Sequence, residues 1–516
     1  MKIVNLIKGS LAKTMLILAL ATSFTGCKKF LDTTRQGGYD EENYPYPGGS
    51  GPYDQFIFGA YNSLRDYNVH ADGFINATSI RSDDADKGST PSDGGADVIS
   101  MDNFPVLPNN GRANALWTGY FGLINKCNST LYQIGTNTNI VTTDLIKVQS
   151  QAEVRFIRGY SYFMLTRFFG RVPIIDTLFA DPAAQNNVKQ SSTIELYAFI
   201  EKDLNFAAAN LPSGWDPTKF AGRATSGAAY GLLAKVYLTQ QKWPLAMAAA
   251  STVMNSGKYN LQTPYAAIFG EDGENSSESI FEVQGRADAN NPTSQGIQYA
   301  GIQGVRGAGA WDIGWGWNTP SVFLEAAYEA NDPRKARTIL YTSTAILPGL
   351  TIYGELTPLG LPNPRYNNKV YSNPSVRSSV GNRFGYWMNV RLLRYADVVL
   401  MYAEAANEIG GVANITAAKT ALNSVRLRAR AGNAAILPDV TTNDQAVLRD
   451  AIRRERRVEL AMEHDRFFDI VRWGIAQSAL NAAGKINFLD SRDVLLPIPQ
   501  TQIDLSAGVL TQNTGY

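Results

Sequence analysis

Three tryptophans lie within seven residues of one glycine-rich segment, at Trp311, Trp315 and Trp317. An indole ring offers a large flat apolar face, and such a face stacks on the C–H side of a sugar ring. The neighbouring Asp312 and Asn318 carry polar groups that suit sugar hydroxyls. The alternative is that the rings fill the core beneath the loop. We predict that at least one of the three tryptophans lies in a ligand site and binds by stacking.

A polar cluster, RSDDAD at 81–86, combines one arginine with three carboxylates. Calcium prefers carboxylate and carbonyl oxygens, so Asp83, Asp84 and Asp86 are a candidate calcium site, although the segment lacks the frame of an EF-hand. The same loop suits hydrogen bonding to sugar hydroxyls. Arg81, Asp83 and Asp84 are therefore our polar candidates for the ligand site.

The segment 452–460 (IRRERRVEL) is basic enough to suggest nucleic-acid binding, but its spacing argues otherwise. Residues three and four apart share one face of a helix. That face carries Leu448, Ile452, Glu455, Glu459 and Met462. Buried charges must be paired, so we predict a structural ion-pair network around Glu455 and Glu459. A catalytic carboxylate pair, as in an all-helical glycoside hydrolase, is the alternative, and it requires two carboxylates about 5–9.5 Å apart.

The composition excludes several classes of protein. The chain has 516 residues, of which 44% are apolar, so it can bury a large core. Two histidines and two cysteines are too few for a disulfide scaffold or a Cys/His metal centre. The 47 basic and 46 acidic residues balance, which argues against binding nucleic acid through general charge. His70 and His464 are isolated in the sequence and belong to no catalytic triad pattern.

Helical periodicity dominates the elements that must position these residues. In 144–169, for example, Val148, Ala152, Phe156 and Tyr160 form one apolar stripe. We predict helices at about 53–67, 113–134, 144–169, 191–210, 225–240, 243–256, 321–330, 334–340, 393–409, 414–430, 445–463 and 465–480. Strand alternation is scarce and is predicted only at 172–175 and 279–283.

The predicted helices come in pairs. Leu233, Ala234, Tyr237 and Ala246 have the spacing of a tetratricopeptide helix hairpin, and 393–430 is a second candidate pair. Long polar loops separate the helices at about 83–112, 284–320 and 341–390. Loops of this length in a compact domain are usually functional or disordered. The sequence therefore predicts a helical scaffold that carries ligand-binding loops.

The N-terminus is typical of an export signal. Lys2, Lys8 and Lys13 flank and precede the apolar run 15–21, which is too short to span a bilayer. FTGC at 24–27 is similar to a bacterial lipoprotein cleavage box, so we predict a signal peptide at 1–26, a lipid on Cys27 and a tether at 27–52. A plain signal peptide with an unmodified Cys27 is the alternative. Lipid chains would tether the protein to a membrane surface.

Several stretches, in this order, resemble the SusD/RagB family of Bacteroidota outer-membrane lipoproteins. They are AEVRFIRG at 152–159, FGRVP at 169–173, IEKDL at 200–204, GRAT at 222–225, LAKVYL at 233–238, GWG at 314–316, DPR at 332–334, LRYAD at 393–397, YAEA at 402–405, ERRVEL at 455–460, PIP at 497–499 and LTQNTGY at 510–516. The sequence departs from the family pattern at His464, where glycine is usual, and at Thr514, where proline is usual. These departures fall in framework turns.

The resemblance implies an all-α fold with about four tetratricopeptide-like hairpins, a loop-rich ligand-binding part and minor short strands. It implies one domain at 53–516, with an N-terminal part at 53–260 and a C-terminal part at 261–516. It also implies a non-catalytic, lipid-anchored protein on the outer face of the outer membrane that passes a glycan to a SusC-like TonB-dependent transporter. Family members usually need no cofactor, although some carry calcium. A RagB-type member that takes up peptide or protein is the alternative.

Overall fold

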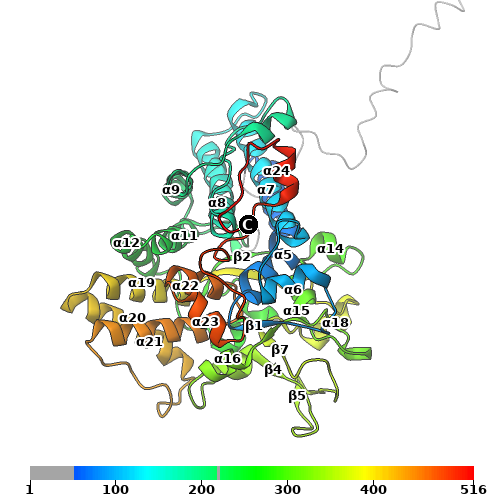
Figure 1. Cartoon of the computed structure of the whole chain (residues 1–516). Coiled ribbons are helices and arrows are strands. Elements are labelled where there is room, and N and C mark those ends of the chain that lie inside the picture. Colours follow the sequence, from blue (N-terminus) through cyan, green and yellow to red (C-terminus); the bar gives the residue numbers. More distant parts are fainter. Residues whose placement is uncertain (1–50, 218–220) are drawn as a thin grey trace, which may run out of the picture. The chain divides into compact units, whose positions relative to one another are not determined.

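Long helices occupy one side of the molecule, and short elements joined by loops occupy the other (Figure 1). The structure is a computed structural model that describes residues 51–217 and 221–516, with one compact unit from Tyr53 onward. The predicted export signal, the lipid on Cys27 and nearly all of the tether lie outside the described residues. Within the described ranges, no helix has the length and hydrophobicity needed to cross a membrane.

The long helices pack in pairs. α3 (Asp54–Ser63) packs on α7 (Gly111–Thr136), α8 (Asp144–Phe169) on α9 (Thr193–Asn210), α11 (Ser226–Thr239) on α12 (Trp243–Met254), and α19 (Tyr395–Ile409) on α20 (Val412–Ala429). Contacts of α7 with α8, α9 with α11 and α12 with α19 join the pairs, and α21 (Gln445–Glu459) packs on α19 and α20. The predicted all-α, tetratricopeptide-like scaffold is confirmed.

Helix α8 shows how local sequence sets these elements. The Thr143 hydroxyl caps its N-terminus by accepting a hydrogen bond from the Ile146 N–H, and Gly170 ends it with a φ of 71°. In its middle, Gly159 allows a close approach of α9, because a Cβ at this position would lie 3.0 Å from the Leu204 side chain. Most of the second half of α8 is buried, so this helix is the centre of the scaffold.

The loop-rich side contains four small antiparallel pairs of strands. They are β1 (Ala85–Gly88) with β3 (Trp317–Pro320), β2 (Ser279–Val283) with β8 (Val390–Arg394), β4 (Ile339–Tyr341) with β7 (Arg365–Asn367), and β5 (Thr351–Ile352) with β6 (Glu355–Leu356). In the first pair, Ala85 lies opposite Pro320 and Gly88 opposite Trp317. Two loops that are far apart in the sequence are thereby joined.

The remaining helices are short, and most of them lie on this side. They are α4 (Tyr67–His70), α5 (Asp72–Ile75), α6 (Gly95–Asn103), α13 (Tyr265–Ile268), α14 (Pro292–Gln295), α15 (Tyr299–Gln303), α16 (Val322–Ala327), α17 (Arg334–Thr338), α18 (Pro374–Val380), α22 (Arg466–Arg472), α23 (Ala476–Ala482) and α24 (Gln500–Leu505). The last of them, α24, lies beside α7 (Figure 1). Two sequence predictions are wrong here. The helix predicted at 465–480 is two helices, because Gly474 adopts a φ of 68° between them. The strand predicted at 172–175 is reduced to one bridge between Pro173 and Gln190.

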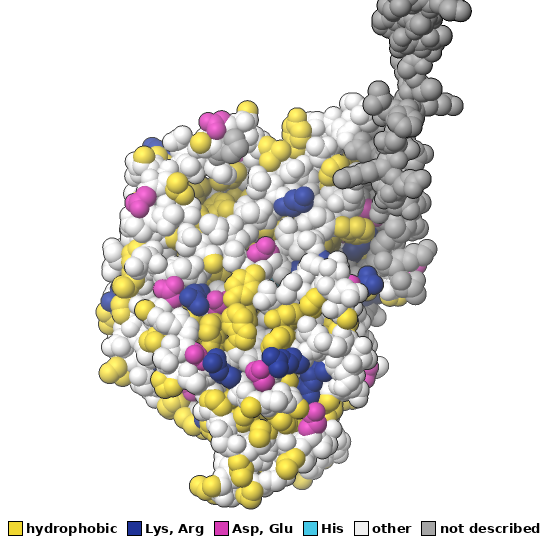
Figure 2. Space-filling model, turned by 90° about the vertical axis from the view of Figure 1, so that its right-hand side faces the viewer, with side chains coloured by type: hydrophobic (Ala, Val, Ile, Leu, Met, Phe, Trp, Pro, Cys, Tyr) yellow, Lys and Arg dark blue, Asp and Glu magenta, His cyan; other side chains and the backbone are white. Residues whose placement is uncertain are grey.

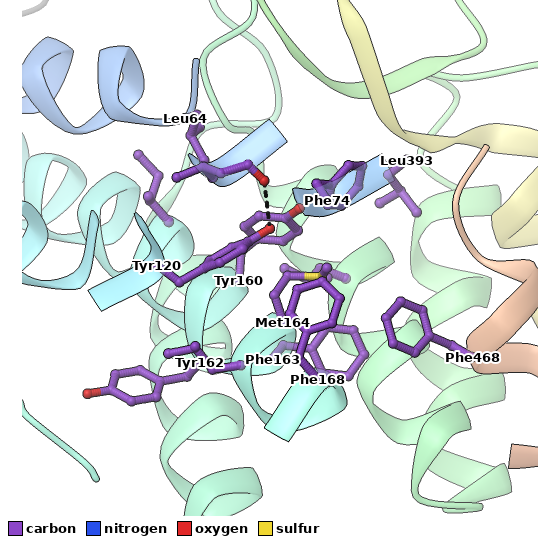
Figure 3. Packing of buried hydrophobic residues seen from close by; sticks show 14 of the residues in the cluster. Leu64, Phe74, Tyr120, Tyr160, Tyr162, Phe163, Met164, Phe168, Leu393 and Phe468 are labelled. Carbon is purple, nitrogen blue, oxygen red and sulfur yellow. Dashed lines mark hydrogen bonds between the residues drawn. The ribbon is translucent and has the colours of Figure 1, made fainter. Parts of the chain in front are cut away.

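Aromatic packing joins the two sides of the molecule. Figure 3 shows Tyr160, Phe163 and Phe168 of α8 beside Phe74 and Phe468 of the loop-rich side. The ring centroids of Phe168 and Phe468 are 5.8 Å apart. Aromatic pairs at such distances add to the stabilisation from burial. The loop-rich side therefore rests on a closely packed base.

Candidate functional site

The three tryptophans of the glycine-rich loop lie in different environments. Trp311 is 8% exposed and packs against Tyr371, with 5.9 Å between ring centroids. Trp317 is 5% exposed and belongs to the main core. Only Trp315 is partly exposed, and its ring meets that of Trp317 edge-on at 5.3 Å. The stacking prediction therefore narrows to Trp315, whose ring packs against the buried Trp317, whereas Trp311 belongs to a separate core cluster.

Glycines allow this loop to cross α15 at close range. A Cβ on Gly314 would lie 2.4 Å from the Gly304 Cα, a contact that no other residue type tolerates. The backbone N–H of Trp315 donates to the Gly301 carbonyl at 2.9 Å. This crossing fixes the position of Trp315. The glycine-rich composition is therefore a packing requirement.

Two further rings meet at the same place, and both come from the long loop at 341–390. Phe384 and Tyr386 stack on each other with centroids 5.5 Å apart. Both lie against Gly301, because a Cβ there would be 2.5 Å from the Tyr386 ring and 3.2 Å from Phe384. Gly301 is also the residue whose carbonyl holds Trp315. Sequence reasoning missed these rings, and the only signal was the aromatic run FGYW at 384–387.

Tyr67 of α4 completes the group. Its pKa is raised by burial and by the neighbouring Asp72 carboxylate, with a smaller contribution from Tyr386. Tyr67, Trp315, Phe384 and Tyr386 are all partly exposed, and we call them the aromatic surface. The face toward which α14 and α18 lie shows hydrophobic side chains gathered in its middle, with basic and acidic groups beside them (Figure 2).

Polar groups border the aromatic surface. The Arg112 guanidinium lies 5.9 Å from the centre of the Trp317 ring and pairs with Asp72 at 3.1 Å. Arg383 pairs with Asp312 at 2.9 Å, and the two side chains are 51% and 38% exposed. Exposed pairs of this kind are weak and contribute little to stability, so their hydrogen-bonding groups remain open to a ligand.

A pocket of about 280 Å³ adjoins the aromatic surface. Phe58 and Tyr61 form its apolar wall, and Gln295 lines its rim. Two residues after Gln295, the Ile297 N–H donates a hydrogen bond to the Tyr386 carbonyl at 2.6 Å. The pocket therefore lies close to the aromatic surface, and we treat the two as parts of one candidate site.

The polar candidates at 81–86 lie elsewhere and are largely buried. Arg81 is 1% exposed, with its guanidinium 4.2 Å from the centre of the Phe467 ring. Asp83 accepts two hydrogen bonds from Arg466, both at 2.8 Å. Asp84 accepts from Arg457 at 2.7 Å. The prediction that Arg81, Asp83 and Asp84 contact a ligand gains no support from these surroundings, and we leave them out of the candidate site.

The same geometry gives no support to the calcium alternative at Asp83, Asp84 and Asp86. Burial tends to raise the pKa of Asp83, but the hydrogen bonds and charges of Arg466 and Arg457 outweigh it and lower that pKa. The two arginines already supply positive charge beside Asp83 and Asp84. In residues 51–217 and 221–516, no three His, Cys, Asp or Glu side chains are arranged to hold a metal ion.

The predicted ion-pair network around Glu455 and Glu459 is confirmed. Glu459 is fully buried and accepts from Arg334 at 3.1 Å, Arg394 at 3.2 Å and Arg428 at 2.5 Å. Burial opposes its ionisation, but the arginine charges prevail and lower its pKa to about 2. Glu455 pairs in the same way with Arg334. Both carboxylates are engaged inside the protein, so they do not form a carboxylate pair across an open cleft.

Two family profiles match most of the chain. One is described as the SusD family and matches residues 277–516. The other is described as starch-binding associating with outer membrane and matches residues 59–238.

Similar proteins agree with these matches. SusD-like protein P2 of Formosa agariphila is 28% identical over 477 residues, which cover 89% of this chain and 91% of that protein. A solved structure described as a laminarin-binding SusD-like protein has a TM-score of 0.74 and 28% identity, covering 90% of this chain and 99% of its own.

A second structure, surface glycan-binding protein A of Bacteroides thetaiotaomicron in complex with laminarihexaose, shares the fold. Its TM-score is 0.72, with 24% identity over 89% of this chain and 98% of its own. Together with the helix-pair scaffold and the ordered motifs, these matches show that the chain belongs to the SusD/RagB family.

Proposed function

We propose that this protein binds glycans on its aromatic surface and delivers them, without catalysis, to a SusC-like TonB-dependent transporter. In this proposal the lipid on Cys27 anchors it to the outer membrane, with the aromatic surface toward the cell exterior. One observation carries the proposal. Three partly exposed rings, those of Trp315, Phe384 and Tyr386, come from two separate chain segments held against Gly301, and Tyr67 lies near Tyr386.

The geometry suits a sugar chain. Flat rings on a preformed base bind with little ordering cost, and bordering polar groups orient the ligand. The solved relative at 28% identity is described as laminarin-binding, which supports a glycan ligand for this chain. One matching family profile is described as associating with outer membrane, which supports the proposed location.

The absence of catalysis is part of the proposal. The carboxylate pair that sequence analysis considered for hydrolysis, Glu455 and Glu459, is bound by buried arginines. A glycosidase needs one carboxyl group to protonate the leaving oxygen and a second to attack or activate water. Release of reducing sugar by the purified protein would contradict this part of the proposal.

The binding site is tested by calorimetric titration of a laminari-oligosaccharide into single variants. Trp315→Ala and Tyr386→Ala should each weaken binding about tenfold, because each removes a stacking face. Trp243→Ala is the matched control, since Trp243 is also a partly buried tryptophan at the edge of the core but belongs to α12. Equal glycan affinities for the wild type and all three variants would contradict the proposed binding site.

The anchor and the partner have their own tests. Cys27→Ser should move the protein out of the outer-membrane fraction, and retention there would contradict the lipid anchor. Affinity purification of the tagged protein from its native membrane should recover a TonB-dependent transporter. Recovery of the protein without a transporter would contradict the delivery role.

A further inference from the structure

The pocket beside the aromatic surface holds an imbalance of charge. Four charged side chains line it: Arg65, Arg223, Arg286 and Glu282. Two of them have opposite charges nearby that neutralise them. Arg223 pairs with Glu153 and with Asp54, and Glu282 lies 3.7 Å from Arg391.

Arg65 and Arg286 have no such partner. Among the described residues, neither guanidinium lies within ion-pair distance of a carboxylate. Arg65 instead donates to neutral oxygens, the Gln295 carbonyl at 2.6 Å and the Asn62 side chain. A guanidinium has five N–H groups, so most of its hydrogen-bonding capacity remains.

The backbone of Arg286 lies beside the Arg65 guanidinium, and both side chains line the pocket. The Gln295 carbonyl that accepts from Arg65 also accepts from the Arg286 backbone N–H at 2.9 Å. Arg65 is only partly exposed, and burial lowers its pKa with no carboxylate to counter the effect. A partly desolvated cation without a counter-charge is unfavourable, whereas an anion at this position would remove the penalty.

We infer that this pocket binds the acidic group of a sugar, a carboxylate or a sulfate ester, between Arg65 and Arg286. The inference rests on the proposed function, because the acidic sugar belongs to the same glycan whose neighbouring rings lie on the aromatic surface. The arginine fork matches the paired oxygens of either group. The volume of about 280 Å³ is near the lower end of small-ligand sites and suits one sugar residue.

The test compares each acidic probe with its neutral counterpart by calorimetry. One pair is an oligogalacturonate and its methyl ester, and the other is a sulfated galactan oligosaccharide and its desulfated form. At least one acidic probe should bind about tenfold more tightly than its counterpart, and the pair that does so distinguishes carboxylate from sulfate. Added salt should reduce this preference. Absence of any preference in both pairs, including absence of binding, would overturn the inference.

Single-residue variants show which side chains cause the preference for the acidic probe. Arg65→Gln and Arg286→Gln should each remove most of the preference, and Arg65→Lys should restore part of it, since it keeps the charge but loses the fork. Arg171→Gln is the matched control, because Arg171 is exposed, donates only to Thr511 and does not line the pocket. A preference that survives both glutamine variants would overturn the inference. Arg286 is exposed, so its variant retains the fold even if the Arg65 variant does not.

If neutral laminari-oligosaccharides bind in a Trp315-dependent way while no acidic preference exists, only the inference fails. If no glycan of any kind binds, the proposed function fails with it.

Discussion

Arginines serve opposite purposes in the buried network and in the pocket. Around Glu459, the guanidinium groups of Arg334, Arg394 and Arg428 are buried, and each finds carboxylate partners inside the protein. In the pocket, Arg65 donates to neutral oxygens, and within the described residues neither Arg65 nor Arg286 pairs with a carboxylate. Removing one partner of a buried charge pair destabilises the fold, whereas a half-buried cation without a counter-charge is stabilised by an anion that binds from outside. The comparison separates residues that build the protein from those that serve its ligand.

The tryptophans of one loop divide in the same way. Trp311 sits in a small core cluster with Ile313 and Tyr366, while Trp315 keeps part of its ring at the surface. Their proximity in the sequence says nothing of this difference. The difference predicts that substitutions in the two regions affect different quantities, stability in one and affinity in the other.

The largest effect is expected for Glu459→Gln. Three buried arginines would lose a counter-charge, so the free energy of unfolding should fall by about 3–5 kcal/mol. Asp439→Asn is the control, because Asp439 pairs with Arg430 while its side chain is 56% exposed, and the loss there should stay below about 1 kcal/mol. Urea unfolding measures both. Equal free energies of unfolding for the two variants would contradict the structural role assigned to the buried network.

Trp311→Ala should destabilise nearly as strongly. Removal of a buried tryptophan leaves a cavity and costs about 3–5 kcal/mol. The affinity of the folded fraction for a laminari-oligosaccharide should stay close to that of the wild type, in contrast to Trp315→Ala. If Trp311→Ala weakens binding and leaves the unfolding midpoint unchanged, the two tryptophans have the reverse roles.

Asp83→Asn tests the reassignment of the 81–86 cluster. Loss of the charge that binds Arg466 and Arg457 should lower the free energy of unfolding by about 3 kcal/mol without changing glycan affinity. Asp504→Asn provides a comparison, because Asp504 is exposed and its change should be nearly neutral. A stable Asp83→Asn protein with weakened glycan binding would return Asp83 to the ligand site.

The two buried histidines, His70 and His464, should have a smaller effect on stability, and this effect should depend on pH. The Nδ1–H of neutral His70 donates to the Leu64 carbonyl, and its Nε2 accepts from the Tyr160 hydroxyl, both at 2.7 Å. Burial lowers the pKa of His70 to about 4 and that of His464 to about 3. The unfolded chain takes up these protons near pH 6.5, before the folded protein does. The stability that the folded protein gains from its neutral histidines is therefore complete above pH 6.5 and is lost as the pH falls toward 4.

At pH 5 each histidine should lower the free energy of unfolding by about 2 kcal/mol relative to pH 8. Urea midpoints at the two pH values would be compared between the wild type and the His70→Gln/His464→Gln double variant. The variant should show the shallower pH dependence, since it lacks both protonation sites. The same dependence in both proteins would exclude the histidines as its source.

Periodic elements were predictable, and their contacts in loops were not. The bounds of α8 and β2 were predicted as observed, because each has a clear apolar pattern and Gly170 ends α8. The paired glutamates of α21 followed from helical spacing for the same reason. Phe384 and Tyr386 lie in a loop without periodicity, and only the tertiary contact with Gly301 brings them to Trp315. The unpaired state of Arg65 likewise depends on neighbours that are far away in the sequence.

The central claim is that a glycan lies on the aromatic surface, and a crystal structure with a bound laminari-oligosaccharide tests it most directly. The account predicts sugar rings stacked on Trp315 and Tyr386, with the chain continuing toward the pocket at Arg65. An oligosaccharide bound elsewhere, for example in the pocket of about 270 Å³ lined by Trp117, Phe121 and Leu510, with the aromatic surface bare, would contradict it.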